Sequence, residues 1–132
     1  MKIDGGCHCG KITYSAEVDP ETVGICHCTD CQTLSGSAFW VSVGATKENF
    51  HPQGDIKIYI KTAESGGKRA QGFCPDCGTA IYATAATDPQ VFNIRVGTVR
   101  QRAELNLYRK LQRSQFRTAT GPRVLMAASK EL

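Results

Sequence analysis

Apolar and polar residues alternate along much of this chain, as they do in β-strands that are buried on one face. The alternation is clearest in residues 11–17 and 55–61. The apolar positions there are Ile12, Tyr14 and Ala16 in the first segment, and Ile56, Ile58 and Ile60 in the second. Residues 38–43, 80–83 and 91–96 are also rich in β-branched and aromatic residues, and turn-forming Pro and Gly residues separate the segments. We predict a mainly β fold with mostly antiparallel strands, in which both alternating segments are half-buried.

One short helix is predicted directly after a cysteine-rich segment at residues 26–31. Thr29 and Gln32 have the spacing of a capping box, and Gly36 can end the helix. Cys31 would then lie in the first turn, where free backbone N–H groups favour a thiolate over a thiol. Residues 103–115 show no clean period, and we expect a loop with some helix there.

The length of 132 residues fits one domain, residues 1–132, and the hydrophobic content of 41% gives it a modest core. A structural metal would stabilise such a domain by restricting the unfolded chain. No apolar run is long enough to cross a membrane, and the N-terminus does not resemble a signal peptide. We therefore expect a cytoplasmic protein, whose thiols stay reduced. The odd number of cysteines, seven, also argues against a disulfide framework.

All seven cysteines fall into three short clusters. The first cluster holds Cys7 and Cys9, the second Cys26, Cys28 and Cys31, and the third Cys74 and Cys77. Thiolates this close together are typical metal ligands, because one ion neutralises several negative sulfurs at once. Their softness favours zinc, with iron as the alternative in a four-sulfur site. We therefore predict a metalloprotein with zinc as its cofactor.

The first and third clusters together supply the four ligands of a tetrahedral site with a structural role. Cys74 and Cys77 can wrap one ion in a tight turn, for which Gly78 can adopt a positive φ. Cys7 and Cys9 are two residues apart, so in a regular strand their sulfurs share one face. Such a site would join the N-terminal strand to the middle of the chain.

The middle cluster then has three ligands, and a three-ligand zinc site keeps one position open for water or a substrate thiol. Zinc acts there as a Lewis acid, so a bound thiol loses its proton near neutral pH and becomes a nucleophile. Two alternatives stay open. The cluster is also compatible with a redox or sensor role, and other ligand pairings are possible among the seven cysteines.

Other residues near the cysteines receive simpler interpretations. His8 and His27 each lie between two cysteines, and alternation directs them outward, so we expect exposed histidines or partners of ligands. Trp40 is predicted to belong to the core. Asp30 and Asp76 are interpreted as solvated turn residues.

The net charge of +4 is concentrated toward the C-terminus, in a basic segment at about residues 98–132 and just before it. Between residues 95 and 123 the single acid is Glu104, and the basic residues are Arg95, Arg100, Arg102, Arg109, Lys110, Arg113, Arg117 and Arg123. Such a segment is commonly a solvated face, but it can also attract an acidic small molecule or nucleic acid. Aromatic residues are sparse here, which disfavours nucleic acid. The alternative function is therefore a non-enzymatic zinc module that binds a protein or nucleic acid through this segment.

Three motifs together resemble the glutathione-dependent formaldehyde-activating enzyme family, also called the centromere protein V-like family. They are Gly6-Cys7-His8-Cys9-Gly10, the segment from Cys26-His27-Cys28-Thr29-Asp30-Cys31-Gln32 to Gly36, and Phe73-Cys74-Pro75-Asp76-Cys77-Gly78. Val96-Gly97-Thr98 resembles a further family element. The joint spacing is far more specific than any one pair.

The resemblance implies an Mss4-like fold of twisted antiparallel sheets stapled by two zinc ions. It assigns a structural zinc to Cys7, Cys9, Cys74 and Cys77, and a catalytic zinc to Cys26, Cys28 and Cys31. It also implies a carbon–sulfur lyase that joins glutathione, as co-substrate, to formaldehyde and forms S-hydroxymethylglutathione. The expected partners are therefore a small-molecule thiol and an aldehyde.

Overall fold

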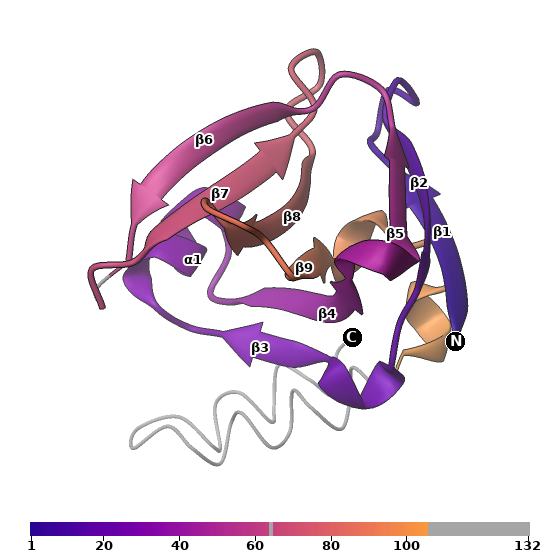
Figure 1. Cartoon of the computed structure of the whole chain (residues 1–132), viewed down its shortest axis with the longest axis horizontal. Coiled ribbons are helices and arrows are strands. Elements are labelled where there is room, and N and C mark those ends of the chain that lie inside the picture. The colour runs from indigo at the N-terminus through magenta and orange to yellow at the C-terminus, as the bar shows by residue number, and fades with distance from the viewer. Residues whose placement is uncertain (64, 106–132) are drawn as a thin grey trace.

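The computed structural model describes residues 1–63 and 65–105, which form two antiparallel β-sheets and one short α-helix (Figure 1). The smaller sheet has the order β1-β2-β5, with β1 at Lys2–Gly6, β2 at Thr13–Glu17 and β5 at Phe50–Gln53. The larger sheet has the order β3-β4-β9-β8-β7-β6. Its strands are β3 (Gly24–Cys26), β4 (Trp40–Thr46), β6 (Lys57–Thr62), β7 (Lys68–Phe73), β8 (Ala80–Ala85) and β9 (Val91–Arg95). Short 3-10 turns occupy Pro20–Thr22, Lys47–Asn49, Val96–Thr98 and Arg102–Glu104. The predicted mainly β, antiparallel fold is confirmed.

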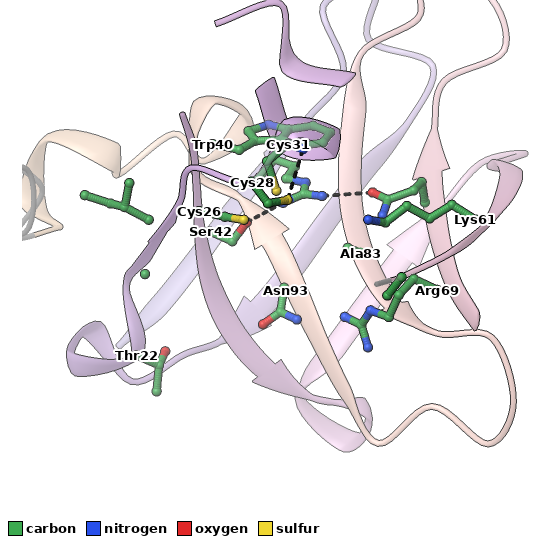
Figure 2. Close-up of a pocket in the computed structure, with 15 residues that line it drawn as sticks. Thr22, Cys26, Cys28, Cys31, Trp40, Ser42, Lys61, Arg69, Ala83 and Asn93 are labelled. Carbon is green, nitrogen blue, oxygen red and sulfur yellow. Dashed lines mark hydrogen bonds between the residues drawn. The ribbon is translucent and has the colours of Figure 1, made fainter. Parts of the chain in front are cut away.

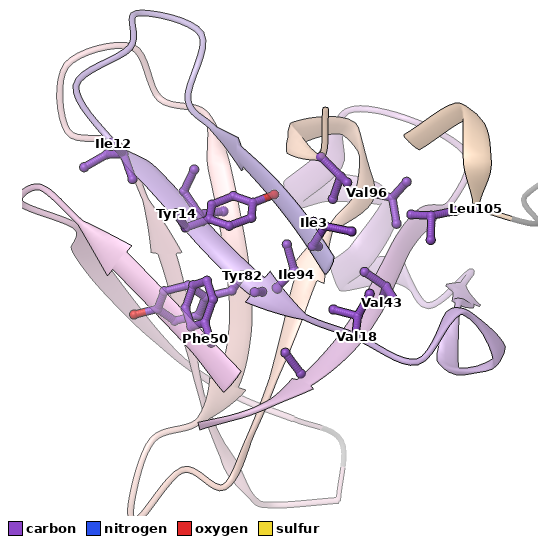
Figure 3. Packing of buried hydrophobic residues seen from close by; sticks show 14 of the residues in the cluster. Ile3, Ile12, Tyr14, Val18, Val43, Phe50, Tyr82, Ile94, Val96 and Leu105 are labelled. Atoms are coloured by element: carbon purple, nitrogen blue, oxygen red, sulfur yellow. The ribbon is translucent and has the colours of Figure 1, made fainter. Parts of the chain in front are cut away.

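The core lies where the smaller sheet packs against the larger one (Figure 3). Tyr14 of β2 is 4% exposed and alternates with exposed neighbours, as the period of two predicts. The Phe50 ring lies 5.6 Å from the Tyr14 ring and 5.5 Å from the Tyr82 ring, both edge to face, which is a favoured aromatic geometry. Val43 and Ile94, from neighbouring strands of the larger sheet, are fully buried in the same cluster. The alternation in residues 11–17 thus marks a core-facing strand correctly.

The larger sheet presents polar residues on its other face. Gln71 lies opposite Ala83, and Ala83 lies opposite Asn93, across three adjacent strands. Ser42 of β4 lies opposite Arg95 of β9. Side chains of opposed residues share one face, because successive residues in a strand alternate between faces. This polar face, rather than the core face, borders the functional site.

The alternating segment at residues 55–61 forms β6, as predicted, but its burial was predicted wrongly. Ile58 and Ile60 are 43% and 47% exposed. β6 is an edge strand and pairs only with β7 among the described strands. The buried core cluster takes no residue from β6, because the three-stranded sheet is too narrow to cover the far edge of a six-stranded one.

The predicted helix is α1, Thr29–Ser35, and it ends at Gly36 as expected, with φ 66°. Its start differs from the predicted capping box. The N-cap is Cys28, whose sulfur accepts a hydrogen bond from the Cys31 backbone N–H. The Gln32 side chain instead donates to the His27 carbonyl oxygen at 2.8 Å. A sulfur therefore replaces the hydroxyl that usually occupies this position.

Much of the basic segment lies outside the described residues. The structure describes Arg95, Arg100 and Arg102, and Arg100 bonds Asp4 at 3.1 Å. The predicted loop with some helix at residues 103–115 is described only as far as residue 105, where a 3-10 turn at Arg102–Glu104 fits it. Within the described chain, no helix has the length and apolar character needed to cross a membrane.

Candidate metal centres and the adjoining cavity

The first and third cysteine clusters meet in space. The sulfurs of Cys7, Cys9, Cys74 and Cys77 all lie within 4.8 Å of one another. The Cys7 and Cys9 sulfurs are 3.5 Å apart, and those of Cys9 and Cys74 are 3.7 Å apart. Four sulfurs bound about 2.3 Å from one tetrahedral zinc ion would lie about 3.8 Å from each other. The donor set and its spacing therefore fit zinc.

Cys7 and Cys9 reach this site from a turn rather than from a strand. β1 ends at Gly6, and the Gly10 N–H donates to the Cys7 carbonyl oxygen at 3.2 Å. The strand geometry predicted for this pair is therefore wrong, although the two sulfurs do converge. The Ile12 N–H donates to the Cys7 sulfur at 3.2 Å, which stabilises negative charge on a buried thiolate.

Cys74 and Cys77 occupy the tight turn that their spacing predicts. Gly78 has φ +78°, and its N–H donates to the Cys74 carbonyl oxygen at 2.9 Å. The Thr79 hydroxyl lies 3.2 Å from the Cys77 sulfur. This hydrogen bond, followed by backbone N–H groups of Thr79 and Cys9, lowers the pKa of Cys77 to about 5. The Thr79 hydroxyl oxygen also accepts from the His8 N–H at 3.1 Å and so joins the two turns.

A surface ion pair between Lys11 and Asp76 joins the same two turns. Asp76 is therefore an ion-pair partner and not merely a solvated turn residue. Because both side chains are exposed, the pair adds little stability.

The middle cluster forms a second, separate group of sulfurs. Cys26 ends β3, Cys28 caps α1 and Cys31 lies in the first turn of the helix, and their sulfurs are all within 4.8 Å of one another. Three sulfurs at this spacing fit three positions around a tetrahedral zinc ion and leave the fourth position to another ligand.

The helix start favours a thiolate at Cys28 rather than at Cys31. The Cys31 N–H donates to the Cys28 sulfur at 3.3 Å and lowers the pKa of Cys28. Burial raises the pKa of Cys31 to about 12, and the neighbouring sulfurs add to this effect. The prediction that the helix start favours a thiolate at Cys31 is therefore wrong, and the effect falls on the N-cap residue Cys28 instead.

A cavity of about 410 Å³ opens beside the middle cluster (Figure 2). This volume lies within the range typical of small-molecule sites. Figure 2 shows the three sulfurs close to Trp40 and Ser42 on one side of the cavity, with Lys61 and Arg69 on the other. The floor is the polar face of the larger sheet.

Arg95 is the central charged residue of this floor and is 7% exposed. It donates to the Ser42 hydroxyl and to the Gln71 amide oxygen, both at 2.8 Å, and its Cζ lies 3.4 Å from the centroid of the Trp40 ring. Its Nε is buried without a hydrogen-bond partner among the described residues. Burial lowers the pKa of Arg95 to about 10, although the Cys31 and Cys26 sulfurs favour its charged form. A fixed positive charge therefore lies close to the middle cluster.

The comparisons with known proteins agree with this arrangement. The sequence profile of the glutathione-dependent formaldehyde-activating enzymes matches residues 2–118. The chain belongs to this family. The crystal structure of a Rhodobacter sphaeroides protein has a similar fold, with a TM-score of 0.59 and 17% sequence identity over 74% of this chain and 87% of that chain. At this identity the likeness concerns the fold alone. No curated protein gives a significant sequence match.

The mainly β architecture fits the Mss4-like fold expected of a glutathione-dependent formaldehyde-activating enzyme. The sequence predicted the grouping of the seven sulfurs into sets of four and three, and the exposure of His8 and His27. The roles of these cysteines as zinc ligands stay predictions. Sequence reasoning misjudged Trp40, which is only half-buried and lines the cavity. It also read Asp30 as solvated, whereas its carboxylate bonds the Lys61 ammonium at 2.9 Å.

The cavity floor was the larger omission. Asn93 and Arg95 alternate with Phe92 and Ile94 along β9, a pattern that predicts a solvated polar face. That face instead points into the cavity under the middle cluster. The signal that was present in the sequence is the alternation itself, which places Asn93 and Arg95 on one face of β9.

Proposed function

We propose that this chain activates the thiol of glutathione at a zinc ion held by Cys26, Cys28 and Cys31, and adds it to formaldehyde. The product would be S-hydroxymethylglutathione. The observation that carries the proposal is the convergence of three sulfurs within 4.8 Å at one side of a 410 Å³ cavity. A three-ligand set leaves one ligand position open, which is the arrangement of catalytic rather than structural zinc sites. Family membership supports the choice of thiol and aldehyde.

Zinc, when bound, would lower the pKa of a thiol at the open position and so supply a thiolate near neutral pH. The thiolate sulfur attacks the carbonyl carbon, a carbon–sulfur bond forms, and the π electron pair of the carbonyl moves to oxygen. The oxygen takes up one proton, which balances the proton lost by the thiol. No oxidant or reductant is needed.

The chain contributes fixed charges and donors to this site. The Cys31 N–H stabilises the Cys28 thiolate and lowers the pKa of Cys28, which favours the deprotonated form that binds metal. Arg95 places a buried guanidinium near the sulfurs and offsets part of the negative charge that gathers when a further thiolate joins three others. The two hydrogen bonds and the ring contact of this arginine hold its charge in place.

We further propose that Cys7, Cys9, Cys74 and Cys77 hold a structural zinc ion. Four sulfurs fill its coordination, two of the four cysteines are buried, and the surrounding turns provide N–H and hydroxyl donors to the sulfurs. This site leaves no position for a substrate. Its role would be to fix β1 and the turn after β7 to each other.

Exchange NMR with ¹³C-labelled formaldehyde and reduced glutathione tests the catalytic proposal, because it measures adduct formation above the uncatalysed rate. Cys28→Ser should return the rate to that background. The serine still caps α1, so folding should be preserved. Thr33→Ala, at an exposed position of the same helix, should keep the full rate.

Two results would contradict the proposal. One is a zinc-loaded wild-type protein that leaves the uncatalysed rate unchanged. The other is Cys28→Ser protein that lacks its middle zinc and retains the wild-type rate. The first result would favour the alternative of a non-enzymatic zinc module.

A further inference from the structure

We propose that Arg69 selects the thiol substrate by binding a carboxylate at the side of the cavity opposite the sulfurs. This inference rests on the proposed function, because it takes a thiol at the middle cluster as given. It adds the residue that distinguishes an acidic thiol from a neutral one. Three observations carry it: the charge of the cavity, the engagement of its other cations, and the pairing of β6 with β7.

Apart from the three cysteine sulfurs, the charged side chains that line the cavity are of one sign. Its described lining includes the basic side chains of Lys61, Arg69 and Arg95 and no acidic side chain. Concave sites lined by one sign of charge concentrate ligands of the opposite sign. The cavity therefore favours an anionic ligand, and the question is which cation meets it.

Two of the three cations are already engaged. Arg95 donates to Ser42 and Gln71 and stacks on Trp40. The Lys61 ammonium bonds the Asp30 carboxylate at 2.9 Å, and its side chain is only 16% exposed. The Arg69 guanidinium, by contrast, makes no side-chain hydrogen bond or ion pair with another residue that the structure describes. Its planar pair of N–H donors matches a carboxylate.

The strand register gives an independent argument. Lys61 of β6 lies directly opposite Arg69 of β7, so two cations share one face at adjacent positions. Like charges directly opposite each other in a sheet are destabilising. Asp30 offsets the charge of Lys61 but leaves that of Arg69. A ligand carboxylate on Arg69 would complete an alternating arrangement of two cations and two anions.

The position of Arg69 also limits the ligand. Arg69 and Gln71 are two residues apart on the same face of β7, which is about 7 Å along a strand. Gln71 contacts Arg95, which lies near the sulfurs. A ligand that joins the middle cluster to Arg69 must therefore carry its carboxylate several bonds from its sulfur. A small peptide thiol meets this condition.

Isothermal titration of the zinc-loaded full chain with reduced glutathione, and with its diethyl ester, whose carboxyl groups carry no charge, tests the inference. Wild-type protein should bind the acid about tenfold more tightly than the ester, as expected of one charge-assisted pair. Arg69→Gln should bind both thiols with the affinity that the wild type has for the ester. Arg69→Lys should retain part of the preference.

The matched control is Lys68→Gln, which removes a positive charge from the adjacent residue of the same strand. Lys68 lies on the other face of β7, bonds Thr62 at 2.8 Å and does not line the cavity. This variant should keep the wild-type preference.

Each outcome has a separate meaning. Equal affinities of the wild type for acid and ester, or an unchanged preference in Arg69→Gln, overturn the role of Arg69 and leave the thiol site intact. Failure of both thiols to bind wild-type protein overturns the proposed function as well. A loss of preference in Lys68→Gln equal to that in Arg69→Gln would show a general charge effect and also overturn the inference.

Discussion

Tyr14 brings a phenol hydroxyl into the core, where it lies 2.7 Å from the Thr98 hydroxyl. Burial raises the pKa of Tyr14 to about 12. The neutral form is therefore favoured in the folded protein, and it contributes stability fully below the unfolded pKa of about 10. That contribution is lost as the pH rises through about 12. A single hydroxyl thus links the core to alkaline stability.

Tyr14→Phe should reveal this linkage. At pH 7 the variant loses one partly buried hydrogen bond and should be destabilised by about 1 kcal/mol. Between pH 9 and pH 11.5 the difference from wild type should narrow, because phenylalanine cannot ionise whereas Tyr14 can. Urea unfolding at a series of pH values measures this difference in the free energy of unfolding. A difference that stays constant with pH would show that Tyr14 does not ionise with an altered pKa in the folded state.

At the scale of the element, α1 is short and depends on its two ends. Its C-cap, Gly36, has φ 66°, and a Cβ built there would meet no atom within 4 Å. Gly36→Ala should therefore destabilise the protein through backbone strain alone, by about 1 kcal/mol. Gly97→Ala serves as the control, because that site is equally open and has no positive φ. Chemical denaturation of both variants measures the difference, and equal stabilities would contradict the strain argument.

The elements were predictable where local pattern decides them. The alternation around Tyr14 located β2, and the glycine at position 36 located the end of α1. The exposure of Ile58 was not predictable, because a period of two identifies a strand but not its place in the sheet. The cap by Cys28 was missed because sulfur is not a usual capping atom.

At the scale of the whole molecule, the four-sulfur site joins residues that are far apart in sequence. Cys9 and Cys74 are separated by 65 positions, and their sulfurs are 3.7 Å apart. A bound ion would therefore close a long loop and restrict the unfolded chain. The three-sulfur site spans only residues 26 to 31 and restrains little of the chain.

Cys74→Ser and Cys31→Ser should differ accordingly. Cys74 is fully buried, and its replacement should lower the melting temperature by about 10 °C or more, because the four-sulfur site would no longer hold its ion. Cys31→Ser should lose zinc from the middle site with a much smaller shift. Thermal denaturation with zinc analysis by elemental methods measures both effects. Equal melting temperatures would show that the two sites do not divide into structural and catalytic roles.

The grouping of the sulfurs into sets of four and three was predictable from the spacing of the cysteines along the chain. The cavity floor was not, because it is assembled by strand pairing. Ser42 and Arg95 are 53 residues apart and become partners only when β4 pairs with β9. Arg69 and Lys61 likewise become neighbours only through the register of β7 with β6. The sequence alone therefore indicated the family and the groups of cysteines, but not which residues form the floor of the cavity.

β7 carries Arg69 and Gln71 along the cavity and then runs directly into the turn that holds Cys74 and Cys77. Four sulfurs bind a zinc ion more tightly than three. The first equivalent of zinc added to apoprotein would therefore occupy the four-sulfur site. A preparation with one zinc per chain would then be folded and would lack the middle zinc on which the proposed function depends. The number of zinc ions per chain, and not a circular-dichroism spectrum of folding, therefore shows whether purified protein has both sites filled.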